Sequence, residues 1–218
     1  MELYKQGSRG EMVKRIQRVV HCADDGIWGP LTTEAVMAWQ MEHGLTADGI
    51  VGPATMAKMF PSVIGLKKSK RVITDIVVHC TASREDVAMT VEDIRRIHKA
   101  NGWSDIGYHY VIDHLGQRHE GRDVDISGAH VSGHNAHSIG VVYVGGLDKH
   151  GTPKDTRTDA QKAALLSLLL DLRRLYPDAK IRGHRDFSPD LNHNGIIEPQ
   201  EWIKACPCYD ARTEYRMV

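Results

Sequence analysis

The sequence predicts an α/β protein, with a mixed central sheet flanked by helices and a small three-helix domain at the N-terminus. After residue 71, short β-branched apolar runs alternate with helical patterns, which is typical of a sheet covered by helices. The first sixty residues instead carry helical patterns separated by a repeated glycine–proline turn. The length of 218 residues suits two domains. We expect a helical domain at 1–60, a linker at 61–70 and an α/β domain at 71–218.

Composition excludes several classes of partner. Lys and Arg number 28 and Asp and Glu also number 28, so we expect no attraction to nucleic acid. No apolar stretch approaches the roughly 18 residues of a membrane span, so we expect no membrane insertion. Residues 1–8 lack the apolar core of a signal peptide, which predicts a protein made in the cytoplasm. The four cysteines form no C-x-x-C pair, so reduced thiols are expected.

The N-terminal helices are predicted from their start signals. Ser8–Glu11 has the form of a capping box for the first helix. The turn Asp25–Thr32 (DGIWGPLT) recurs 23 residues later as Asp48–Thr55 (DGIVGPAT), and each proline suits the first position of a following helix. These turns resemble those of the type 1 peptidoglycan-binding module, which implies binding to wall glycan or stem peptide. A generic helical domain is the alternative, and Trp28 is a candidate either for stacking on sugar or for the core.

A basic run, Lys67–Arg71, follows the helical domain. We interpret it as part of a solvated, flexible connector. Weak attraction to anionic wall polymers is the alternative interpretation.

The α/β domain is predicted element by element from periodicity and turn residues. Thr90 and Thr158 begin capping boxes, and the leucines after Thr158 are spaced for a long buried helix. Gly116 allows a hairpin. Strands are predicted at 72–79, 105–112, 118–121, 139–144 and 180–184, and helices at 90–101 and after 158.

Two of these strands end in histidine, and a cysteine follows further along the chain. His79 and His184 are candidates for metal ligands at one edge of the sheet, and Cys206 could add a thiolate. Purely structural histidines are the alternative, because sequence does not show whether the three converge. Cys208 is the rival thiolate.

Six motifs give the second domain a family resemblance. In chain order they are VVHCTA (77–82), GYHY (107–110), NAHSIG (135–140), VGG (144–146), GHRD (183–186) and KACP (204–207). Residues 71–217 thereby resemble the type 2 N-acetylmuramoyl-L-alanine amidases, and most of all the zinc-dependent phage lysozyme-type amidase. That fold is shared with the peptidoglycan recognition proteins.

The resemblance implies roles for seven residues. It implies Zn²⁺ ligands at His79, His184 and Cys206, active-site residues at Tyr108 and Lys204, and substrate-binding positions at His130 and Asn135. It further implies hydrolysis of the amide between N-acetylmuramic acid and L-alanine, with Lys204 and Tyr108 stabilising the oxyanion.

Residues 190–201 (DLNHNGIIEPQE) match the pattern of a calcium loop. The implied Ca²⁺ ligands are Asp190, Asn192, Asn194, the Ile196 carbonyl, Glu198 through water, and Glu201. Pro189 argues against an entering helix, so the loop is expected to be isolated, EF-hand-like and of modest affinity. A surface turn that binds nothing is the alternative. Because the loop lies between His184 and Cys206, calcium would order the segment that carries the zinc ligands.

Together these features predict an endolysin that acts on bacterial peptidoglycan in the cell wall, as a monomer. A bacterial autolysin with the same chemistry is the near alternative. A non-catalytic peptidoglycan receptor would share the fold, but Cys206, Tyr108 and Lys204 count against it. A zinc peptidase would usually show another ligand pattern, such as H-E-x-x-H, which is absent from the sequence.

Overall fold

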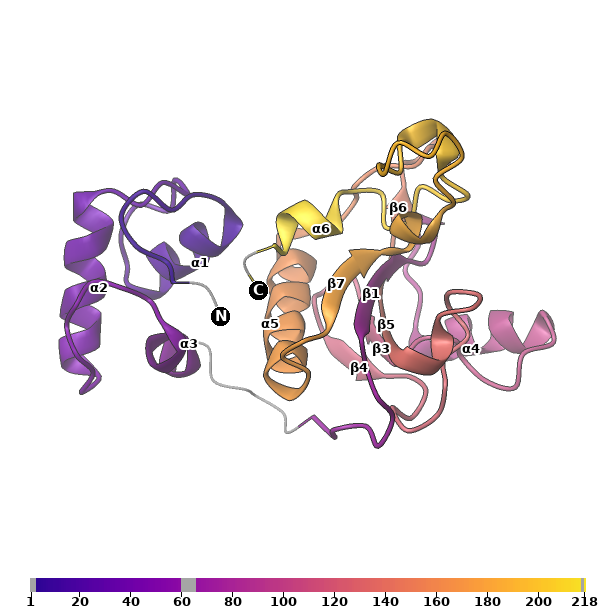
Figure 1. Ribbon diagram of the computed structural model, residues 1–218, viewed down its shortest axis with the longest axis horizontal. Coiled ribbons are helices and arrows are strands. Elements are labelled where there is room, and N and C mark those ends of the chain that lie inside the picture. Colours follow the sequence, from indigo (N-terminus) through magenta and orange to yellow (C-terminus); the bar gives the residue numbers. More distant parts are fainter. Residues whose placement is uncertain (1–2, 60–65, 217) are drawn as a thin grey trace. The chain divides into compact units, whose positions relative to one another are not determined.

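The computed structural model describes residues 3–59, 66–216 and 218, and the chain divides into two compact units at Gly65 and Leu66 (Figure 1). The described part of the first unit contains three helices, and the second contains a mixed sheet with helices. The predicted fold class is therefore confirmed. None of the described helices is long and apolar enough to cross a membrane.

The first unit consists of α1 (Glu11–Val19), α2 (Pro30–Glu42) and α3 (Pro53–Met59). Helices α2 and α3 begin at the prolines of the two repeated turns, as predicted. The predicted cap of α1 is wrong, because the helix is preceded by Gly10 and has no side-chain cap. Ser8 lies next to Arg9, which forms an isolated bridge with Ile27 of the first turn, and the Ser8 carbonyl accepts the Trp28 N–H at 3.0 Å.

A buried glutamine lies behind each repeated turn and explains its sequence. The Gln17 side chain bonds the Asp25 carboxylate, the Gly26 N–H, the Ile27 carbonyl and the Thr32 hydroxyl. The Gln40 side chain bonds Asp48, Gly49, Ile50 and Thr55 in the same way. Each glutamine is 1% exposed, so the aspartate and threonine recur because they satisfy a buried amide. Trp28 is buried as well, which favours its core role.

The second unit is built on a five-stranded sheet in the order β4-β3-β5-β1-β7. Strands β3, β5, β1 and β7 run parallel to one another, and the edge strand β4 pairs antiparallel with β3. A separate parallel pair joins β2 and β6. The strands are β1 (Asp75–Cys80), β2 (Ser83–Arg84), β3 (Tyr110–Ile112), β4 (Arg118–Glu120), β5 (Ser138–Tyr143), β6 (Gly146–Leu147) and β7 (Lys180–Gly183).

Helices cover both faces of this sheet (Figure 1). Helices α4 (Val91–Ala100) and α5 (Asp159–Leu175) begin at the predicted capping boxes of Thr90 and Thr158, and α6 (Ala211–Glu214) follows near the C-terminus. Ile94 of α4 packs against Val142 of β5. Since His79 is the register partner of Val142 in β1, its side chain lies on the α4 side of the sheet.

The predicted linker is shorter at its C-terminal end than expected. Residues 60–65 lie outside the described part of the chain. Lys67 forms ion pairs with Asp123 and Asp125 at 3.0 and 2.7 Å, and the buried Ser69 hydroxyl donates to the Val124 carbonyl at 2.7 Å. The basic run is therefore bound to the second unit, through the carboxylates of Asp123 and Asp125 and the carbonyl of Val124.

Candidate active site

Three predicted metal ligands meet at the C-terminal edge of the sheet. His79 lies near the end of β1 and His184 directly follows β7. These strands are parallel neighbours in which Val78 pairs with Gly183, so the next residue of each chain segment is a histidine at the same level of the sheet. One ligand atom from each of His79, His184 and Cys206 lies within 4.8 Å of the others. The His79 Nδ1 atom is 3.2 Å from His184 Nδ1 and 3.7 Å from Cys206 Sγ. Among the described residues this is the one group of histidine, cysteine or acidic side chains with such spacing.

Hydrogen bonds to neighbouring elements fix the position of Cys206. Its carbonyl accepts the Arg185 N–H at 2.8 Å, and the Tyr143 hydroxyl donates to the next carbonyl, that of Pro207, at 2.8 Å. The Cys80 N–H donates to Cys206 Sγ at 3.3 Å. The rival thiol of Cys208 instead lies 3.7 Å from Cys80 Sγ and outside the cluster.

Burial controls the protonation of the two histidines. It lowers the pKa of His79 well below its usual value, with further lowering by the nearby His130 and His184. Burial and the positive charge of Lys204 lower the pKa of His184 to about 4. Both imidazoles are therefore neutral near pH 7 and present a lone pair, as a metal ligand must.

Tyr108 and Lys204 lie beside this cluster. The Tyr108 ring centroid is 5.1 Å from that of His79. Burial raises the pKa of Tyr108 above its usual range, so its hydroxyl stays protonated and can donate a hydrogen bond. Lys204 is exposed, and its charge acts on both histidine ligands. The edge of the sheet thus combines a neutral donor with a positive charge.

His98 is a neighbour of the site that the sequence analysis did not predict. Its ring centroid is 5.4 Å from that of Tyr108, and its Nδ1 atom accepts the Gly107 N–H at 2.9 Å. It therefore helps to fix the backbone directly before Tyr108. The sequence contained one indication of this position. His98 follows the apolar Ile94 by four residues, so both lie on the face of the amphipathic helix α4 that is turned toward the sheet.

His130 and Asn135, the predicted substrate-binding residues, have hydrogen-bond partners within the fold. His130 is 7% exposed, and its Nδ1 atom is 3.1 Å from Nε2 of His79. The Asn135 side-chain oxygen accepts the N–H groups of His130 and Val131 at 2.8 and 2.9 Å. His130 therefore contacts the ligand His79 from behind, and the Asn135 side-chain oxygen holds the His130 backbone.

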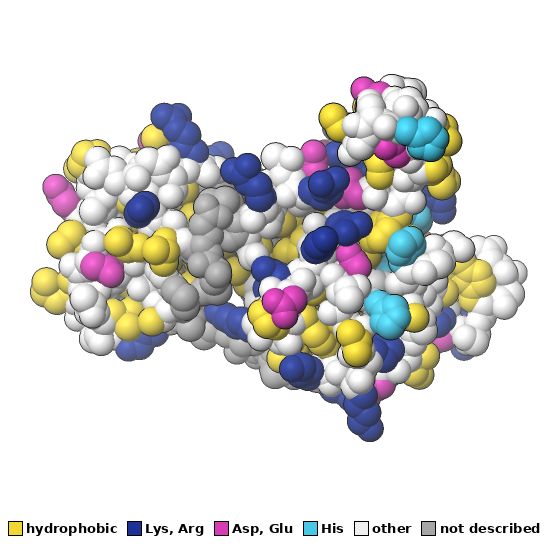
Figure 2. All heavy atoms as spheres, viewed as in Figure 1, with side chains coloured by type: hydrophobic (Ala, Val, Ile, Leu, Met, Phe, Trp, Pro, Cys, Tyr) yellow, Lys and Arg dark blue, Asp and Glu magenta, His cyan; other side chains and the backbone are white. Residues whose placement is uncertain are grey.

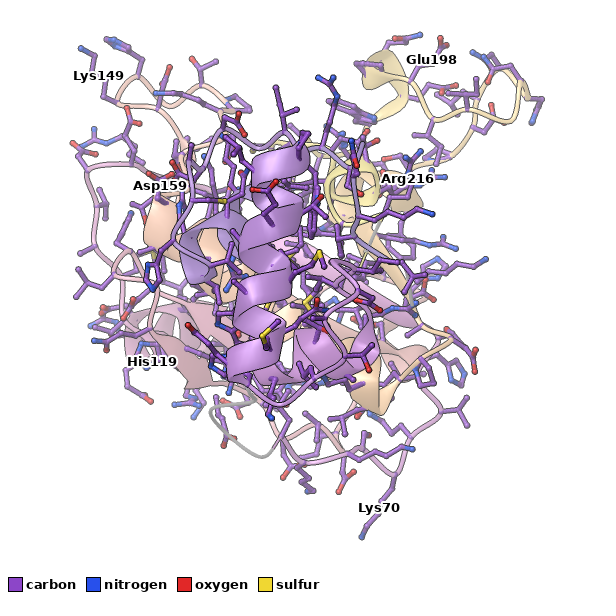
Figure 3. All side chains as sticks on the ribbon, turned by 90° about the vertical axis from the view of Figure 1, so that its left-hand side faces the viewer. Lys70, His119, Lys149, Asp159, Glu198 and Arg216 are labelled. Atoms are coloured by element: carbon purple, nitrogen blue, oxygen red, sulfur yellow. The ribbon has the colours of Figure 1, made fainter. Side chains whose placement is uncertain are left out.

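The predicted calcium loop, residues 190–201, projects from the second unit, with Glu198 on its outer part (Figure 3). Its surface carries acidic and apolar side chains (Figure 2). No α-helix leads into it, as Pro189 predicts, and it ends in a short 3-10 helix, Pro199–Glu201.

Side-chain oxygens at the predicted calcium positions face the loop's own backbone. The first and last residues, Asp190 and Glu201, each accept more than one backbone N–H, and Glu201 is buried. Its N–H partners, that of Glu198 foremost, lower the pKa of Glu201 and keep it ionised. Asn192 and Asn194 accept the N–H groups of Asn194 and Ile196, and Glu198 accepts from the Asn192 amide.

Comparison with known protein families identifies the class of this fold and site. Residues 69–202 match the family described as N-acetylmuramoyl-L-alanine amidase, and residues 9–59 match the family described as a peptidoglycan binding domain. The first match covers more than half of the sequence, so the chain belongs to the N-acetylmuramoyl-L-alanine amidase family. This confirms the predicted family and enzyme class. The match ends before Lys204 and Cys206.

Individual relatives agree with the family. The chain is 40% identical to the endolysin of Klebsiella phage KP32 over 139 residues, which is 64% of this chain and 83% of the relative. It is 38% identical to the endolysin of Escherichia phage T7 over 144 residues, 66% of this chain and 86% of the relative.

Solved structures share the fold. The N-acetylmuramoyl-L-alanine amidase LysCS from Clostridium intestinale URNW superimposes with a TM-score of 0.52 at 23% identity, over 71% of this chain and 94% of that one. Bumblebee PGRP-SA superimposes with a TM-score of 0.51 at 20% identity, over 73% and 90%. At these identities the likeness concerns the fold alone.

Proposed function

We propose that the chain cleaves the amide between N-acetylmuramic acid and L-alanine with a zinc ion held by His79, His184 and Cys206. The observation that carries this proposal is the meeting of two imidazole nitrogens and one sulfur within 4.8 Å at the edge of the sheet. Three such ligands with a fourth position left open are typical of catalytic zinc. Zinc bound there supplies activation of water and polarisation of the scissile carbonyl.

The chain's own side chains then orient the substrate and stabilise charge. Tyr108 donates its hydroxyl proton in a hydrogen bond to the oxygen on which negative charge develops, since burial keeps that hydroxyl protonated. The exposed Lys204 adds a positive charge close to the two histidine ligands. Neither group needs to change its protonation state for this role.

The biological role follows from the two units and the relatives. We infer that the N-terminal unit holds the enzyme on peptidoglycan while the second unit cleaves it. Relatives named as endolysins match most of the second unit, so we propose an endolysin, made in the host cytoplasm and acting on the wall as a monomer.

Digestion of purified peptidoglycan, with products identified by mass spectrometry, tests this proposal. We expect stem peptides that begin with free L-alanine, lost in chelator and regained with zinc. New termini inside the stem peptide would indicate a peptidase. Intact strands with retained binding would indicate a receptor.

We also propose that residues 190–201 bind calcium and so order the segment between His184 and Cys206. The order of oxygen-bearing residues supports this, as does the ionised Glu201 at the last position. The same oxygens now accept loop N–H groups, which holds the loop in a compact turn.

Calcium is expected to raise the melting temperature of the wild-type chain, and Glu201→Gln is expected to abolish that rise. At ten times the dissociation constant, calcium would stabilise the fold by about 1.4 kcal/mol, which corresponds to a few degrees. Differential scanning calorimetry with and without calcium measures the effect. Glu120→Gln, at an exposed carboxylate in β4, is the control and should keep the full rise. A wild-type melting temperature that does not change when calcium is added would refute the proposal.

A further inference from the structure

A chain of hydrogen bonds leads from the candidate metal cluster into the interior. His79 Nε2 is 3.1 Å from His130 Nδ1, and His130 Nε2 is 3.3 Å from the Ser138 hydroxyl. The Ser138 hydroxyl is in turn 2.8 Å from the His134 carbonyl. The two side chains behind His79, those of His130 and Ser138, are both buried.

The His134 carbonyl, at the end of this series of hydrogen bonds, determines which atom donates in each of them. The His134 carbonyl can only accept, so Ser138 donates its proton there and its oxygen accepts from His130. His130 therefore carries its proton on Nε2 and has a bare Nδ1. That atom accepts from the Nε2–H of His79.

The consequence is a defined tautomer of His79. With its proton on Nε2, His79 presents a bare Nδ1 to the cluster, and this is the atom that lies 3.2 Å from His184 Nδ1 and 3.7 Å from Cys206 Sγ. A metal-bound histidine needs its other ring nitrogen held by such a partner, which fixes both ring orientation and tautomer.

Packing holds the His130 ring in this position. A Cβ atom added to Gly128 or Gly140 would lie 2.5 or 2.6 Å from the Cδ2 atom of that ring. The His130 ring therefore fits in its position because both neighbouring residues lack a side chain. The Asn135 side chain fixes the His130 backbone at 2.8 Å.

We propose that His130 and Ser138 are positioning residues that set the His79 tautomer for metal binding. This inference rests on the proposed metal site but concerns a separate property of the chain. It assigns His130 a role behind the ligand, in place of the substrate contact that the family resemblance implies.

Two substitutions at one position separate positioning from packing. His130→Asn places an amide oxygen near the position of Nδ1 and keeps an acceptor for His79, whereas His130→Leu removes the acceptor. Zinc affinity, measured by competition with a chromogenic chelator, should fall about 10–100-fold in His130→Leu. It should stay close to the wild-type value in His130→Asn. The exposed His137, changed to leucine, is the matched control.

A second readout needs neither zinc nor activity. In the metal-free chain labelled with ¹⁵N-histidine, NMR should find the His79 proton on Nε2, and Ser138→Ala should produce a mixture of tautomers. A wild-type His79 protonated on Nδ1, or equal losses of zinc affinity in His130→Asn and His130→Leu, would overturn the inference. A wild-type chain that binds no zinc would refute the proposed function, while the NMR result would still decide the tautomer.

Discussion

Replacement of Cys206 by serine is expected to abolish both zinc binding and release of L-alanine-terminated peptides. A serine hydroxyl stays protonated near neutral pH and cannot replace a thiolate ligand. Loss of a partner behind a ligand already costs about 10–100-fold, so loss of the ligand itself should cost more than about 100-fold. Zinc content by atomic absorption and peptide release by mass spectrometry measure the two effects.

Cys208→Ser is the matched control, because the same chemical change is made two residues away. In the wild-type chain the Cys208 Sγ atom lies 3.7 Å from Cys80 Sγ and 3.1 Å from the Gly146 carbonyl oxygen, outside the cluster. Zinc content and activity should therefore stay near wild type. Full activity in Cys206→Ser, or loss confined to Cys208→Ser, would show that the ligand has been assigned to the wrong thiol.

Tyr108→Phe is expected to lower kcat by about 100–1000-fold while zinc content stays unchanged. The substitution removes one preorganised donor to the developing oxyanion and keeps the ring that packs beside His79. Because the donor acts chiefly in the transition state, KM should change little. Steady-state kinetics on a soluble muropeptide separates kcat from KM.

Tyr110→Phe provides the comparison for this result. Tyr110 lies two residues further along the same segment, in β3, and is also buried. Its hydroxyl is not part of the site, so kcat should be retained. A Tyr108→Phe enzyme with wild-type kcat would remove Tyr108 from the mechanism, and one that has lost its zinc would show a structural role.

Local signals made much of the fold predictable. Thr90 and Thr158 cap their helices through contacts within three residues, so the sequence alone contains the information. The same holds for the placing of His79 and His184 at the ends of short predicted strands. The two histidines converge because β1 and β7 are parallel neighbours in the sheet. No local sequence pattern predicts that pairing, and only the family resemblance implied that the histidines bind one metal ion.

Features set by long-range contacts were mispredicted or missed. Ser8 has the residue type of a cap, but the backbone of Ser8 and Arg9 pairs with the turn at Ile27 and Trp28, and the helix begins only after Gly10. Lys67 is predicted to lie in a flexible connector, but the fold brings Asp123 and Asp125 to it, and the ion pairs hold it on the second unit. The burial of His130 likewise depends on Gly140 of a strand lying behind it, which only the folded sheet provides.

Titration of the metal-free wild-type chain with zinc, with release of L-alanine-terminated peptides followed at each step, tests the central claim most directly. If His79, His184 and Cys206 form one catalytic zinc site, activity should rise in proportion to added zinc and level off at one equivalent. Full activity in the metal-free chain, or activity that zinc does not restore, would contradict it.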